Sequence, residues 1–77
     1  MSNKLLSDVG ESLYGARWQT DLSRDLGVSD RTVRRWVAGA DDVPEGVYMD
    51  LHRLVTERAA RLDELAETLK RSAAPGR

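Results

Sequence analysis

The chain contains no cysteine and only one histidine, His52. The missing cysteines exclude disulfides and thiolate metal sites, and one histidine does not suffice for a zinc site built within one chain. We therefore expect no metal and no other cofactor. A chain of 77 residues often needs a disulfide, a metal or a partner subunit for stability. Oligomerisation is thus the stabilising device that we expect.

Long apolar segments are also missing. No apolar run approaches the ~18 residues of a membrane span. The first residues contain one lysine and no apolar stretch as long as a signal peptide needs. We expect a cytoplasmic protein without a membrane partner. No repeat or low-complexity segment divides the chain, which predicts one domain over residues 1–71 and a frayed tail over residues 72–77.

An excess of either charge is lacking too, because the formal net charge is -1 at pH 7. Taken alone, that balance argues mildly against a nucleic-acid partner. The charges are nevertheless unevenly placed. Arginines gather at positions 31, 34 and 35, whereas acidic residues gather at positions 41, 42 and 45. A neutral total can therefore hide a basic face.

Helical periodicity is the main structural feature of the sequence. Apolar residues at helical spacing predict helices over about 3–14, 19–26, 30–38 and 44–71. A glycine follows each of the first three, at positions 15, 27 and 39. We predict an all-α fold, a four- or five-helix bundle with a helix-turn-helix and a long C-terminal helix. A break of that last helix near Arg58 stays open.

Residues 19–36 form the most specific motif, two short helices joined by a Gly-Val-Ser turn. The apolar side chains that can pack between these helices are Leu22, Leu26, Val28, Val33 and Trp36. Such a pair leaves one face of its second helix bare. Because each residue advances about 100° around a helix, Arg31 and Arg35 lie almost opposite the inward side.

The arginines of this helix work against its own stability. Arg31 lies in the first turn, where the helix dipole disfavours a cation. It also forms like-charge pairs with Arg34 and Arg35 at contact spacing. A negatively charged partner removes this conflict. In the DNA major groove an arginine can bond bidentately to guanine or neutralise a phosphate.

The pattern of Gln, Leu, Leu-Gly-Val-Ser, Val and Trp over residues 19–36 resembles the helix-turn-helix of Cro and the lambdoid phage repressors. The resemblance covers about Leu13 to Pro44. In size the chain is also similar to small regulators of phage early genes and of anti-CRISPR operons. The resemblance implies a DNA-binding fold whose second motif helix, residues 30–38, enters the major groove.

Individual roles follow from this resemblance by position. It implies that Gln19 contacts phosphate and that Asp30, Arg31 and Arg35 read bases. Two positions depart from the family pattern. Ser23 stands where alanine is usual, and Asp30 stands where these repressors often carry a neutral amide, which puts base contact by Asp30 in doubt.

Several neighbouring side chains have two interpretations. Arg34 either contacts phosphate or pairs with Asp30, and Asp30 either accepts a bond from cytosine or only favours the helix start. Ser29 is first an N-cap and second a phosphate contact. Thr32 is either a phosphate contact or idle surface. Trp18 either packs against Leu22 or touches the DNA backbone, whereas Trp36 belongs to the core.

The last helix carries an apolar stripe that continues far beyond the small domain. Its two heptad lines are Val55, Leu62 and Leu69, and Leu51, Arg58 and Leu65. By Leu62 the helix has run ~16 Å beyond Leu51, at 1.5 Å per residue. Little core remains to be covered there, so we predict a homodimer interface. Its residues are Arg58, Leu62, Leu65, Ala66 and Leu69. Alternatively, the helix bends at Arg58 and folds back on its own subunit.

These observations predict a sequence-specific regulator that binds an inverted-repeat operator in double-stranded DNA as a homodimer. Repression by occluding a promoter is the expected role, although an activator would use the same module. The alternative is a protein-interaction module, such as an antitoxin or adaptor, whose arginines bind an acidic protein. No catalytic constellation and no small-molecule site is evident, so we expect no enzyme.

Overall fold

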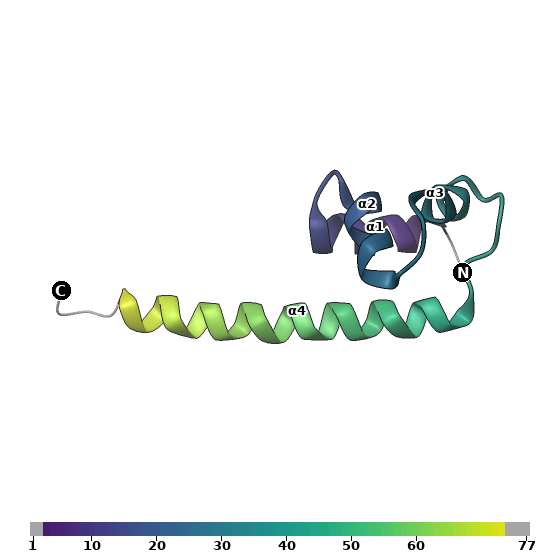
Figure 1. Ribbon diagram of the computed structural model, residues 1–77. Helices are drawn as coiled ribbons and strands as arrows, with labels where there is room; N and C mark the ends of the chain where they lie inside the picture. The colour runs from purple at the N-terminus through teal and green to yellow at the C-terminus, as the bar shows by residue number, and fades with distance from the viewer. Residues whose placement is uncertain (1–2, 74–77) are drawn as a thin grey trace.

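The structure is a computed structural model that describes residues 3–73. Its helices are α1 (Asn3–Tyr14), α2 (Trp18–Leu26), α3 (Asp30–Ala38) and α4 (Glu45–Ser72). No strand occurs within residues 3–73. The all-α fold is therefore confirmed, with four helices in this range. In Figure 1, α1, α2 and α3 gather over one end of α4, while the rest of α4 extends alone.

The helix ends follow local chemistry. Ser29 is the N-cap of α3, and its Oγ accepts a hydrogen bond of 3.1 Å from the backbone N–H of Thr32. Gly27 and Gly39 close α2 and α3 with φ angles of 74° and 78°, a left-handed conformation that glycine adopts without steric cost. Pro44 precedes α4 as its N-cap. The predicted bounds are thus confirmed to within one residue.

The core draws on all four helices. Its buried cluster consists of Leu6, Trp18, Leu22, Val33, Trp36 and Leu51. Within residues 3–73, Leu51 is the one side chain of α4 that is buried, and Leu54 is half-buried. Every residue from Val55 to Ala73 is exposed. Side-chain burial thus ends before the middle of α4, while the helix itself continues without a break at Arg58.

Gly10 has a packing role that the sequence did not reveal. Its propensity predicts only a cost of about 1 kcal/mol within α1. In the structure the Trp18 indole lies directly against its backbone, and a Cβ at this position would overlap the ring. Trp18 is only 4% exposed, so it is a core residue rather than an edge that could touch DNA. Gly10 is needed because α1 and α2 approach so closely.

The C-terminal segment differs slightly from the predicted tail. Ser72 still belongs to α4, and Ala73 caps it with a backbone hydrogen bond of 2.9 Å to the Leu69 carbonyl. The remainder of the predicted tail, residues 74–77, lies outside the described residues. Between Asn3 and Ala73, no helix combines the length and the apolar character that crossing a membrane requires.

Candidate nucleic-acid interface

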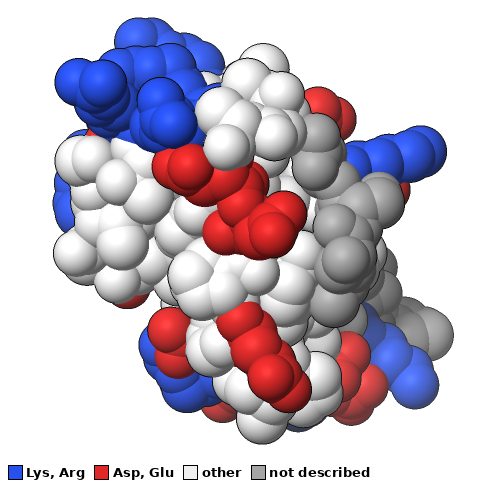
Figure 2. All heavy atoms as spheres, turned by 90° about the vertical axis from the view of Figure 1, so that its right-hand side faces the viewer, with Lys and Arg blue, Asp and Glu red and all other residues white. Residues whose placement is uncertain are grey.

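The outer face of α3 carries the arginines that the sequence singled out. Val33 and Trp36 are buried, which confirms the predicted inward side of this helix. Arg31, Arg34 and Arg35 are all exposed. Figure 2 looks at the end of the molecule where α3 lies and shows a basic cluster with acidic side chains directly beside it. The basic cluster is therefore compact and bounded by acidic residues.

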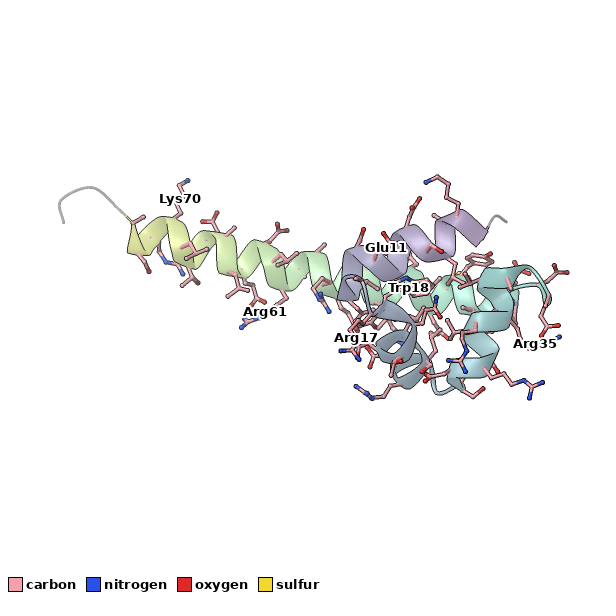
Figure 3. All side chains as sticks on the ribbon, turned by 90° about the horizontal axis from the view of Figure 1, so that it is seen from above. Glu11, Arg17, Trp18, Arg35, Arg61 and Lys70 are labelled. Carbon is pink, nitrogen blue, oxygen red and sulfur yellow. The ribbon has the colours of Figure 1, made fainter. Side chains whose placement is uncertain are left out.

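Arg35 is held by an acidic residue of the loop between α3 and α4. Its Nε lies 2.7 Å from Asp41 Oδ2, and its Nη2 lies 3.3 Å from Asp41 Oδ1. This side-on pair lowers the pKa of Asp41, chiefly through the hydrogen bond, and raises the pKa of Arg35 for the same reason. Figure 3 shows Arg35 at the edge of the body, beside this loop. The sequence did not predict this pair.

Arg31 and Arg34 differ from Arg35 in having no hydrogen-bond or ion-pair partner within residues 3–73. The pairing of Arg34 with Asp30 that the sequence allowed is not formed. Two uncompensated cations thus stand on the first two turns of α3. They remain available to an external anion.

The carboxylate of Asp30 is engaged inside the protein. Its Oδ1 lies 2.6 Å from the hydroxyl of Ser23, which is buried in α2, and its Oδ2 lies 3.5 Å from the hydroxyl of Thr20. Ser23 also lies 2.7 Å from the Thr20 carbonyl oxygen, and its single proton serves one acceptor at a time. Asp30 therefore ties α3 to α2. Serine in place of the usual alanine was the available sign of this contact.

The predicted phosphate contacts lie around the starts of α2 and α3. Ser29 and Thr32 share a hydroxyl–hydroxyl hydrogen bond of 3.0 Å in addition to the N-cap bond. Gln19 is half-buried in the first turn of α2, directly after the buried Trp18. Ser29 is exposed and Thr32 is half-buried. Each of these side chains has at least a partly open surface, and their phosphate contacts stay predictions.

The predicted interface residues lie on the bare half of α4. Leu62, Leu65 and Leu69 are 55%, 40% and 68% exposed, and Ala66 is exposed between them. Figure 3 shows Arg61 and Lys70 projecting from opposite sides of this half of the helix. No part of residues 3–73 buries these leucines. They form an exposed apolar stripe that no other element within residues 3–73 covers.

Arg58 behaves differently from the leucines around it. Its Nη1 donates a hydrogen bond of 2.6 Å to the carbonyl oxygen of Leu13, and its guanidinium carbon lies 5.9 Å from the centre of the Tyr14 ring. Tyr14 in turn donates a hydrogen bond of 2.5 Å to Asp25 Oδ2. Burial, followed by this bond, raises the pKa of Tyr14 to about 12. Arg58 thus fastens α4 to the end of α1, a contact the sequence did not predict.

Comparisons with protein-family models, curated proteins and solved structures found no match to this chain. The described residues contain no group of three or more His, Cys, Asp or Glu side chains that could hold a metal ion. The structure describes a small all-helical protein in which α3 exposes a basic face and the second half of α4 exposes an apolar stripe.

Proposed function

We propose that this chain is a sequence-specific double-stranded DNA-binding regulator that inserts α3 into the major groove. The observation that carries this proposal is the pair of uncompensated arginines, Arg31 and Arg34, on the bare face of a helix whose other face is buried. Arginine recognises guanine edges and phosphates through a fixed fork of donors.

The dimensions of α3 suit this role. Its nine residues span ~13 Å at 1.5 Å per residue. The major groove is ~12 Å wide and admits one helix. Because α3 is fixed to α2 by the Ser23–Asp30 contact and by the buried Val33 and Trp36, its outer face can meet DNA as a rigid surface.

Roles within the interface follow from position. Arg31 and Arg35, opposite the core, are proposed to read bases, and Arg34 is proposed to neutralise a phosphate. Gln19, Ser29 and Thr32 add polar contacts to the backbone around the helix starts. The engagement of Asp30 with Ser23 favours a supporting role over cytosine contact for that carboxylate.

We further propose that two copies pair through the bare half of α4. The partner of this half of α4 is proposed to be a second copy of the chain, because an isologous two-fold contact uses the same patch on both subunits. The exposed leucines at 62, 65 and 69 supply an apolar stripe that a second copy can meet with the same residues. A two-fold dimer presents two reading helices, which fits an inverted-repeat operator and repression of the gene behind it. In this arrangement Arg58 supports α4 within its own subunit.

The direct test measures affinity for a duplex selected from random sequences and for its shuffled version, at several salt concentrations. We expect tighter binding to the selected duplex and an affinity that falls steeply with salt. Arg31→Ala should remove the preference for the selected duplex. Arg71→Ala removes the same charge at the far end of α4 and should leave the preference unchanged.

The same measurement separates the alternative function. A protein-interaction module that uses the arginines of α3 for an acidic protein would show no preference between the two duplexes. Equal, weak binding to both duplexes, unchanged by Arg31→Ala, would contradict the proposal.

A further inference from the structure

The guanidinium of Arg35 has a free edge although it is paired. A guanidinium carries five N–H donors. Asp41 takes the Nε–H and one N–H of Nη2, at 2.7 Å and 3.3 Å. Both N–H groups of Nη1 and the second N–H of Nη2 remain. Those remaining donors form the end of the guanidinium fork, which points away from the carboxylate.

The position of Asp41 is set by Arg35 itself through the backbone. The carbonyl oxygen of Arg35 accepts hydrogen bonds from the N–H groups of Ala40 and Asp41, at 3.0 Å and 3.4 Å. Gly39, at a φ angle of 78°, turns the chain back toward the last turn of α3. One residue thus holds the loop by its carbonyl and is held by the loop through its side chain. Backbone and side-chain hydrogen bonds thus act together on the same pair of residues.

From this geometry, and given the proposed DNA-binding function, we infer that Asp41 is a positioning residue that makes Arg35 specific for guanine. Guanine presents two neighbouring acceptors in the major groove, O6 and N7, which match the two outer donors of the fork. Adenine presents an acceptor and a donor there, and a guanidinium has no acceptor. An arginine held in this orientation therefore favours a G·C pair.

The Asp41 carboxylate also weakens the attraction of Arg35 to DNA phosphates. A free arginine side chain samples many rotamers and can turn to the nearest phosphate, whereas a held one has lost that freedom before DNA arrives. The negative charge of Asp41 also offsets the charge of Arg35 toward the DNA backbone. Arg34, which lacks such a partner within residues 3–73, supplies attraction that does not depend on sequence.

The experiment uses the full chain and the selected duplex, together with duplexes in which each G·C pair is replaced in turn by A·T. Affinities are measured for the unmodified protein, for Asp41→Asn and for Asp42→Asn. The Asn side chain has nearly the shape of Asp and lacks its charge. Asp42 is the exposed neighbour that forms no ion pair within residues 3–73, so it controls for the loss of one negative charge.

We expect one G·C position at which the unmodified protein discriminates by ~10-fold or more, the size of one good bidentate contact. Asp41→Asn should reduce that ratio to ~3-fold or less while affinity for shuffled DNA stays equal or rises. Asp42→Asn should keep the ratio. In an Arg35→Ala background, where discrimination at this position is already lost, Asp41→Asn should change the ratio no further.

Two results would overturn the inference. If Asp41→Asn keeps the discrimination ratio, Asp41 does not position Arg35. If Asp41→Asn also tightens binding to the selected duplex, Asp41 competes with DNA for Arg35. The proposed DNA-binding function would survive that result. If the unmodified protein shows no base preference at all, the proposed function fails and this inference fails with it.

Discussion

The two halves of α4 both carry apolar residues at helical spacing, but their surroundings differ. In the first half, Leu51 is 3% exposed because it belongs to the core cluster to which α1, α2 and α3 also contribute. In the second half, Leu69 is 68% exposed and nothing in residues 3–73 covers it. Both halves carry leucines at helical spacing. Periodicity thus identifies an apolar stripe, whereas the neighbouring elements decide whether the stripe is buried or exposed.

The two halves of α4 also differ in what stabilises them. The body formed by α1, α2, α3 and the first half of α4 has a buried core of its own. A helix without tertiary packing is only marginally stable in water, and the second half of α4 has none within the subunit. Pairing with a second copy would bury its leucines. Four sets of substitutions test whether the two halves differ in this way.

The largest effect is expected from a buried tryptophan. Trp36→Ala should destabilise the protein by about 3–5 kcal/mol, because it leaves a cavity in the core of a small domain. Leu69→Ala, at a concentration where the chain is monomeric, should cost a small fraction of that. Urea unfolding followed by circular dichroism measures both. Equal losses would mean that the second half of α4 packs on its own subunit.

The next effect concerns self-association. Replacing Leu62 and Leu65 by glutamate should weaken the dimer by at least ~100-fold, because burying each leucine contributes about 1.5–3 kcal/mol. Thr56→Glu with Ala60→Glu adds the same charge to the other side of α4 and should leave the dimer intact. Sedimentation measures the association constants. A dimer that survives the leucine changes would place the interface elsewhere.

A smaller effect tests the packing of α1 on α2. Gly10→Ala should cost about 1–3 kcal/mol, because the added Cβ overlaps the Trp18 ring and both helices must shift. Gly46→Ala, in α4, meets open space and should stabilise the protein by about 0.5–1 kcal/mol. Thermal unfolding of both variants gives the comparison. If Gly10→Ala left the stability unchanged, the contact between α1 and Trp18 would be loose enough to accept a Cβ.

The smallest effect is local and appears at alkaline pH. In a Tyr48→Phe variant, Tyr14 is the one tyrosine left, and its phenolate absorbance should rise with a pKa of about 12 rather than 10.0. Because the pKa of Tyr14 is raised in the folded state, its protonated form stabilises the fold. This contribution is complete below pH 10 and is lost as the pH rises toward 12. Asp25→Asn should move the transition toward 10.0. A titration midpoint of Tyr14 at 10.0 in the otherwise unmodified protein would contradict the Tyr14–Asp25 contact.

Sequence reasoning located the helices because their ends are marked by local chemistry. Gly27, Gly39 and the N-cap Ser29 act within a few residues, so their effects can be predicted without the fold. The inward side of α3 was equally accessible from Val33 and Trp36. α2 begins at Trp18, one residue earlier than predicted.

The contacts between elements could not be predicted in the same way. Arg35–Asp41 depends on the path of the loop after Gly39, and Arg58–Leu13 joins residues 45 positions apart. The role of Gly10 depends on how closely α2 approaches α1. Periodicity fixes the direction of a side chain around its helix and leaves the identity of its neighbour undetermined.

We propose that the body reads DNA through α3 and that the bare half of α4 pairs two copies. Selection of bound sequences from random duplex DNA by the unmodified chain tests both parts at once. We predict a consensus of two inverted half-sites, each with a G·C pair whose enrichment is lost in Arg35→Ala. No enriched sequence would contradict DNA reading, and a single asymmetric site would contradict the two-fold dimer.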